Sequence, residues 1–93
     1  MNVEPARITL VQSEGCHLCD DAHGVLDVLA SRGQVQLNVI AARSAEGMSL
    51  VSLHRPSMFP LVLIDDEPFS QGRLPRRKLA KRLALGADDV RVG

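Results

Sequence analysis

Apolar residues near the start of the chain follow the period of a strand and then that of a helix. Residues 7–12 largely alternate between polar and apolar side chains and are rich in β-branched ones, which predicts a strand. From Cys16 onward, apolar residues recur at steps of three or four and form one helical stripe: Leu18, Ala22, Val25, Leu26 and Leu29. Gly33 follows this stripe, and we expect it to end the helix at the C′ position, where glycine suits the left-handed backbone.

The middle of the chain predicts a second strand and a weaker helix. The segment that begins at Val35 places Leu37 and Val39 on the same face as Val35, with polar side chains between them. This alternation indicates a strand. Ser44 is a candidate N-cap for a helix that extends to about Leu53.

The last third of the chain predicts a hairpin and a third helix. Residues 61–64 are wholly apolar, as expected of a strand that is buried on both faces. A polar turn over residues 65–68 and a short strand over residues 69–70 would complete the hairpin. Pro75 is expected at the first position of the last helix, and Gly86 at its end.

The expected order of elements is β-α-β-α-β-β-α, which predicts an α/β fold. A strand, a helix and a further strand in succession favour a parallel pair with a right-handed crossover, and the hairpin adds an antiparallel pair. We therefore expect a four-stranded mixed β-sheet flanked by three helices. Residues 1–93 are expected to form a single domain, with a frayed tail over residues 88–93.

Composition and charge argue against several classes of partner. The formal net charge is zero, which gives no general attraction to nucleic acid or to anionic lipid. No stretch approaches the roughly 20 apolar residues that span a bilayer. The first residues include Glu4 and Pro5 and lack the apolar core of a signal peptide. We therefore expect a cytoplasmic monomer without a nucleic-acid or membrane partner.

Cys16 and Cys19 are the two cysteines of the chain, and they lie at the expected start of the first helix. In the reducing cytoplasm, such a closely spaced pair indicates redox chemistry or metal binding rather than a structural cross-link. A helix N-terminus stabilises a thiolate, and a second thiol one turn further on can resolve a mixed disulfide. The neighbouring His17 favours the ionised thiol, whereas the negative charges of Asp20 and Asp21 oppose it.

Two segments carry a resemblance to a known family: Gly15–Cys16–His17–Leu18–Cys19–Asp20 and Met58–Phe59–Pro60–Leu61. In these segments the chain resembles glutaredoxin-like proteins of the thioredoxin superfamily, of the small bacterial type with a Cys-x-Leu-Cys-Asp motif. The resemblance implies a thioredoxin-like fold and a thiol–disulfide oxidoreductase, in which Cys16 attacks the substrate and Cys19 resolves the intermediate. It further implies that Pro60 is cis and that Pro60 and the backbone of Phe59 shape the substrate site. We count His17 among the substrate-binding residues as well.

The same resemblance suggests the partners of such a protein. The implied substrate is a disulfide-containing protein or a glutathione mixed disulfide, and glutathione is a possible reductant, with no bound cofactor. Glutaredoxins, however, have a glycine pair and an acidic residue after the fourth strand, where this chain has Gln71, Gly72, Arg73 and Leu74. They also have a basic residue shortly before the first cysteine, where this chain has Glu14. The resemblance therefore leaves the electron donor open.

Two other functions remain open at the level of the sequence. The first is a zinc or iron–sulfur site in which histidines complete the ligand set of the two cysteines; the candidates are His17, His23 and His54. The second is an interaction module of thioredoxin-like fold with a dormant dithiol. A basic run from Arg73 to Arg82 is either a solvated helix face or a docking patch for an acidic partner or a carboxylate.

Overall fold

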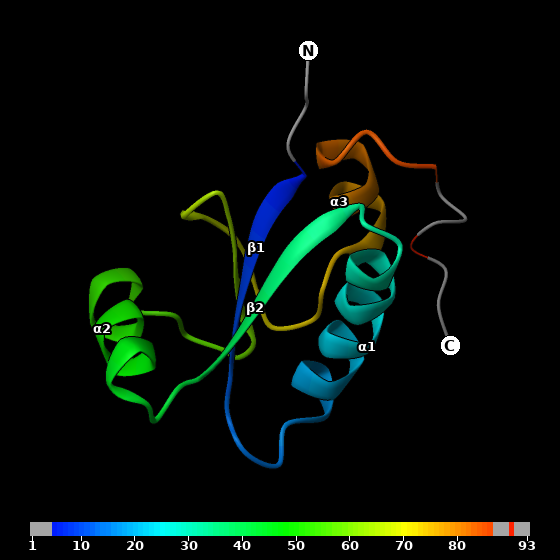
Figure 1. The fold of residues 1–93 in the computed structure, drawn as a ribbon. Coiled ribbons are helices and arrows are strands. Elements are labelled where there is room, and N and C mark those ends of the chain that lie inside the picture. The colour runs from blue at the N-terminus through cyan, green and yellow to red at the C-terminus, as the bar shows by residue number, and fades with distance from the viewer. Residues whose placement is uncertain (1–4, 87–89, 91–93) are drawn as a thin grey trace.

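The computed structural model describes residues 5–86 and residue 90, and Figure 1 shows how their helices and strands are arranged. These elements follow the predicted order: β1 (Ala6–Gln12), α1 (His17–Ser31), β2 (Val35–Ala41), α2 (Ala45–His54), β3 (Leu61–Ile64), β4 (Glu67–Gln71) and α3 (Arg76–Arg82). Within the described ranges, no helix has both the length and the apolar character that a bilayer crossing requires.

The strands form a four-stranded mixed sheet in the order β2-β1-β3-β4. β1 runs parallel to β2 and antiparallel to β3, and β3 and β4 make an antiparallel hairpin. This arrangement confirms the predicted α/β fold class. Antiparallel pairing sets Leu61, the first residue of β3, opposite Val11, near the end of β1. The carboxyl end of β1 therefore lies beside the segment that leads into β3.

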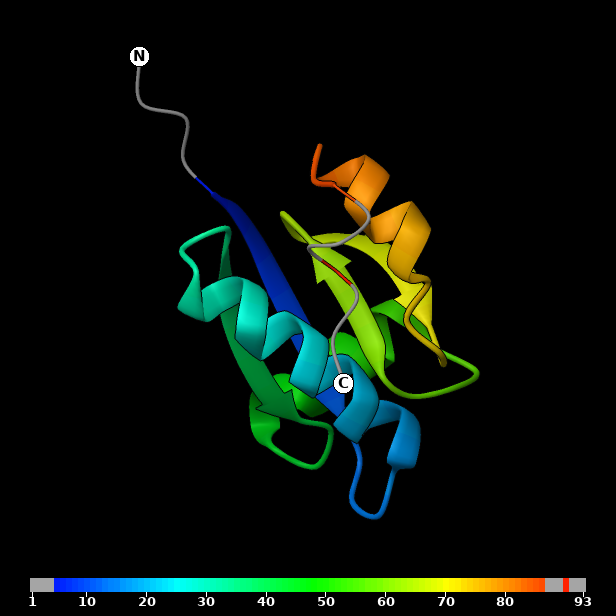
Figure 2. The same ribbon diagram turned by 90° about the vertical axis from the view of Figure 1, so that its right-hand side faces the viewer.

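Helices lie on both faces of the sheet, with α1 and α3 on one face and α2 on the other (Figures 1 and 2). The core under α1 and α3 combines side chains of the sheet and of both helices, among them Ile8, Leu10, Val62, Leu26 and Leu79. The buried cluster on the α2 face consists of Val11, Ile40, Leu61 and Leu63. Side chains of β1 contribute to both clusters because successive residues of a strand point to opposite faces.

The end of α1 matches the prediction from the sequence. Gly33 has a positive φ of 75°, and its N–H donates to the Ala30 carbonyl at 3.0 Å. The N–H of Gln34 donates to the Leu29 carbonyl at 2.9 Å. This pair of bonds is the Schellman arrangement, which satisfies the last carbonyl groups of a helix and requires a left-handed C′ residue.

The bounds predicted for α3 are wrong at both ends. Pro75 is the N-cap instead of the first helical residue, with an extended backbone at φ −80° and ψ 94°. The helix ends before Leu83, and Ala84 takes the C′ position at φ 57°. The N–H of Leu85 donates to the carbonyl of Ala80 at 2.8 Å, which completes a second Schellman arrangement. The sequence predicts the end of the helix at Gly86, which is too far along the chain, because Ala84 already adopts the left-handed backbone that is expected only of glycine.

α2 begins at the predicted cap and is held close to the end of β2. The hydroxyl of Ser44 accepts the N–H of Gly47 at 3.0 Å. A Cβ atom placed on Gly47 would overlap the carbonyl oxygen of Ala41. Leu50 and Val51 pack against the cluster on this face. Glycine is therefore needed where the first turn of α2 contacts the backbone that follows β2.

The hairpin has a shorter turn and a longer second strand than the sequence predicted. Its turn consists of Asp65 and Asp66, both at positive φ (49° and 69°), as a two-residue hairpin turn with the right twist requires. β4 includes Pro68, which the sequence predicts in the turn. Pro68 lies opposite Leu63 on the edge of the sheet, next to a register shift, where a residue without an N–H is tolerated.

Two apolar side chains are less buried than their pattern predicted. Val39 is 37% exposed and lies on β2, which is an edge strand of the sheet. Leu18 is only partly buried, and Cys19 takes the inward position at 1% exposure. The expected tail lies outside the described residues except for Val90, which is buried in the core under α1 and α3.

Candidate active site

Cys16 lies at the junction between β1 and α1, where it is the N-cap of the helix. Its backbone is extended, with φ −107° and ψ 106°, and Gly15 turns the chain just before it at φ 62°. The Sγ atom of Cys16 accepts the backbone N–H of Cys19 at 3.1 Å. This N–H is one of the donors that a helix N-terminus leaves unpaired. The chain therefore directs an N–H and the positive end of the helix dipole at the sulfur of Cys16.

Cys16 and Cys19 form a disulfide, with a Cα–Cα distance of 5.1 Å. Cys19 is 1% exposed, whereas Cys16 is partly exposed. Cys16 is therefore the more accessible of the two cysteines. The resemblance implied that Cys16 attacks first, and this order stays a prediction.

The loop before β3 brings a backbone carbonyl to the dithiol. The Sγ atom of Cys16 lies 3.9 Å from the carbonyl oxygen of Phe59. The peptide bond between Phe59 and Pro60 is cis, as the resemblance implied. The ring of Phe59 packs against the cluster on the α2 face, and Pro60 is buried. Phe59 therefore presents its backbone, rather than its side chain, to the sulfur of Cys16.

The same loop is tied to β4 by several contacts. The Gln71 side-chain oxygen accepts the Ser57 N–H at 3.0 Å, and the Gly72 N–H donates to the Pro60 carbonyl at 3.0 Å. Met58 lies against Gly72, where an added Cβ would be 3.2 Å from the methionine Cε atom. The side chain of Met58 is nevertheless 52% exposed. An exposed apolar side chain thus borders the loop that carries Phe59.

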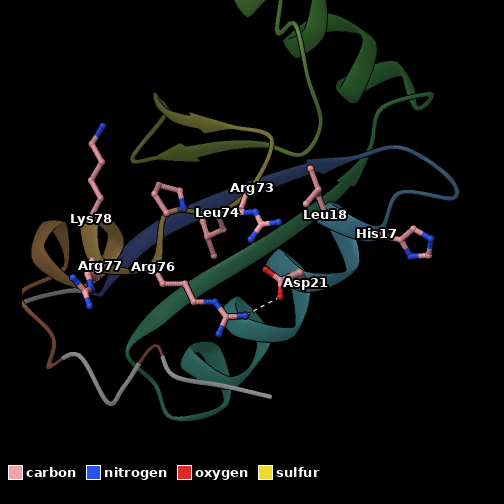
Figure 3. A pocket seen from close by; sticks show the side chains of 9 residues that line it. His17, Leu18, Asp21, Arg73, Leu74, Arg76, Arg77 and Lys78 are labelled. Atoms are coloured by element: carbon pink, nitrogen blue, oxygen red, sulfur yellow. Dashed lines mark hydrogen bonds and ion pairs between the residues drawn. The ribbon is translucent and has the colours of Figure 1, made fainter.

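His17, between the cysteines, is exposed at the first position of α1. No hydrogen bond joins its imidazole to another residue in the part of the chain that the structure describes. In Figure 3 its ring points away from the other labelled side chains. A role for His17 in substrate binding or in tuning the thiolate stays a prediction.

An open groove of about 700 Å³ adjoins the dithiol between α1 and the start of α3 (Figure 3). Leu18, which separates Cys16 and Cys19 together with His17, lines this groove. Asp21 of α1 and Arg76 of α3 form an ion pair across it at 2.7 Å. The sequence pattern did not predict this pair, because 55 positions separate the two residues and no local period connects them.

The histidines that were candidate metal ligands lie apart from one another. His23 follows Cys19 by one turn of α1 and lines a hollow with Asp20 and Asp27, whereas His54 lies in the last turn of α2. Within residues 5–86, and including residue 90, no three His, Cys, Asp or Glu side chains come close enough to hold a metal ion. The described residues thus bring together the two cysteines without further ligands.

Comparison with known proteins gives a match at the level of structure. Neither protein-family models nor curated protein sequences matched the chain. The solved structure of an uncharacterised thioredoxin-like protein from Clostridium perfringens is similar, with a TM-score of 0.65 and 17% sequence identity. The match covers 97% of this chain and 78% of the other. The chain therefore has a thioredoxin-like fold with a Cys-x-x-Cys pair at the N-terminus of α1.

Proposed function

We propose that this protein is a thiol–disulfide oxidoreductase of the glutaredoxin-like class, with Cys16 as the attacking thiol and Cys19 as the resolving thiol. One observation carries the proposal: a partly exposed N-cap cysteine is paired with a buried cysteine and lies 3.9 Å from the Phe59 carbonyl. Thiol–disulfide exchange needs an accessible, stabilised thiolate and a second thiol within reach of it. The Cys16–Cys19 pair meets both needs.

The reaction proceeds by two exchanges. The thiolate of Cys16 attacks one sulfur of the substrate disulfide, forms a mixed disulfide and releases the other substrate sulfur as a thiolate. The thiolate of Cys19 then attacks Cys16 Sγ, which closes the Cys16–Cys19 disulfide and releases the second substrate thiolate. The substrate gains two electrons and, once its thiolates are protonated, two protons. Two molecules of glutathione, which leave as oxidised glutathione, or the two thiols of a dithiol reductase, which form a disulfide, return the pair to the dithiol.

The chain contributes electrostatic stabilisation and positioning to these steps. The N–H of Cys19 and the helix N-terminus stabilise negative charge on Cys16 Sγ. The carbonyl of Phe59 and the buried Pro60 form the wall against which the backbone of an extended substrate would lie. No cofactor is required for exchange between thiols and disulfides.

Single cysteine variants test the assignment of the two roles. Cys16→Ser should abolish turnover of a disulfide substrate, because the attacking thiolate is lost. Cys19→Ser should keep the first exchange and accumulate a mixed disulfide between Cys16 and the substrate, which mass spectrometry detects. Ser31→Ala, on the exposed end of α1, serves as a control that leaves both cysteines in place. Full turnover by the Cys16→Ser protein would exclude the proposed mechanism.

A further inference from the structure

The groove between α1 and α3 carries charge that the dithiol chemistry does not use. Four of its lining residues are cationic and one is acidic: Arg73, Arg76, Arg77 and Lys78 against Asp21. We propose that this groove binds an acidic segment of a protein substrate, next to the disulfide that Cys16 attacks. The proposal rests on the proposed function and specifies its substrate class.

The positive charge of the groove is a local excess. The whole chain has a formal net charge of zero, so the groove differs from the average surface. Asp21 is already paired with Arg76 at 2.7 Å. Arg73 and Arg77 are exposed, and neither forms an ion pair with another of the described residues. Their guanidinium groups are therefore available to carboxylates of a partner.

The position of the groove connects this charge to the reacting sulfur. In Figure 3, Leu18 and Arg73 lie toward the end that carries the dithiol, whereas Arg77 and Lys78 lie toward the opposite end. A segment bound there would extend away from Cys16 along the start of α3. Because the cations are spread along the groove, the fitting ligand is an extended chain with several carboxylates.

The groove also has an apolar part, which suits a polypeptide. Leu18, the buried Leu74 and Pro75 line it between the cationic side chains. Guanidinium groups bind carboxylates through two parallel hydrogen bonds, and clusters of arginines are a recurring means of recognising acidic peptide motifs. Exposed charges act mainly on the rate of association and on the choice between partners. The predicted effect is therefore a preference among substrates that weakens as salt rises.

Three disulfide peptides of matched sequence test this preference. Their residues flanking the disulfide are glutamate in the first, glutamine in the second and lysine in the third. At low ionic strength we expect the kcat/KM of the glutamate peptide to exceed that of the glutamine peptide about three- to tenfold, as two or three exposed ion pairs would produce. The lysine peptide should be the slowest, and 0.5 M salt should largely remove the differences.

A paired variant tests whether the preference arises in the groove. Arg73→Gln combined with Arg77→Gln should bring the ratio of the kcat/KM of the glutamate peptide to that of the glutamine peptide close to one. Lys81→Gln is a control for the loss of a cation elsewhere on α3, because Lys81 is exposed and lies outside the groove. It should keep the ratio of the unaltered protein. Because each ratio compares two substrates on one protein, a general loss of activity or stability does not mimic the predicted effect.

The outcomes separate this inference from the proposed function. Turnover of the glutamine peptide by the unaltered protein tests the function alone, whereas equal rates on all three peptides would overturn only the acidic preference. The proposal would also be overturned if the paired variant slowed only the reduction of oxidised glutathione and left the rates on the peptides unchanged. A fluorescent, alkylated glutamate peptide tests binding without exchange: its anisotropy should rise with the unaltered protein and the Lys81→Gln variant, and less with the paired variant. No difference among the three proteins would overturn the proposal even if exchange were absent.

Discussion

At the scale of single residues, the sulfur of Cys16 is the atom on which the proposed chemistry depends. It accepts the N–H of Cys19 at 3.1 Å at the start of a 15-residue helix, so negative charge on it is stabilised. The nearby acids oppose this only weakly: Glu14 pairs with Arg43 at 3.2 Å, and Asp20 is exposed to water. The ionised form of Cys16 should therefore be favoured in the reduced protein.

This arrangement predicts that the pKa of the Cys16 thiol lies below the value of about 8.5 for a free cysteine. The pH dependence of alkylation by iodoacetamide measures it in a Cys19→Ser variant, which retains the backbone N–H at position 19. The alkylation rate should reach half its maximum at a lower pH in the folded variant than in the same variant unfolded in urea. Equal midpoints in the two states would contradict the proposed role of the helix N-terminus.

The sequence predicted some residues of the site and not others, for physical reasons. The spacing of Cys16 and Cys19 at a strand-to-helix junction was sufficient to predict the pair, because both lie within one local element. The resemblance implied that Phe59 and Pro60 belong to the same site. Periodicity placed Leu18 in the core, whereas it lines the groove. The helical pattern shows which residues share a face of α1, but it does not show where the sheet that covers this face ends.

At the scale of elements, two glycines within helices have opposite consequences. Gly24 lies on the exposed side of α1, and a Cβ added there meets nothing within 4 Å. Gly47 is buried in the first turn of α2, where a Cβ would overlap the backbone of Ala41. At Gly24 a residue with higher helix propensity would fit, whereas Gly47 is needed because α2 contacts the backbone after β2 there.

Alanine at these two positions should therefore shift stability in opposite directions. Gly24→Ala should raise the free energy of unfolding by up to about 1 kcal/mol, because alanine favours the helix. Gly47→Ala should lower it by about 1–3 kcal/mol, since the backbone must move to accept the methyl group. Urea denaturation of both variants measures the two changes. A Gly47→Ala protein as stable as the unaltered one would show that α2 does not pack against the end of β2 as described.

The order and type of the elements were predictable, whereas several of their ends were not. Gly33 ends α1 as predicted because glycine has a known backbone preference at this position. Ala84 ends α3 against its own preference, and no residue type signals such a stop. Pro68 joins β4 because it lies on an edge of the sheet, a fact of the tertiary arrangement that the local sequence does not contain.

At the scale of the whole molecule, the topology of the sheet assembles the candidate site. Antiparallel pairing of β1 with β3 brings Cys16, after the end of β1, to Phe59, before the start of β3. The packing of α1 and α3 on one face brings Leu18 and Arg73 to one groove. Residues more than 40 positions apart thus meet around one sulfur atom. The protein has a thioredoxin-like fold, and we propose that its Cys16–Cys19 pair is a working redox dithiol.

A redox titration of the protein in thiol/disulfide buffers of defined potential tests this proposal most directly. Mass-tagged alkylation would count the free thiols of Cys16 and Cys19 at each potential, and the metal content would be measured on the same sample. We expect a reversible two-electron transition without bound metal, with a midpoint between about −270 and −180 mV, the range that runs from thioredoxin through the glutaredoxins to protein disulfide isomerase. Thiols that never pair reversibly, or that a bound metal protects from alkylation, would contradict the proposal.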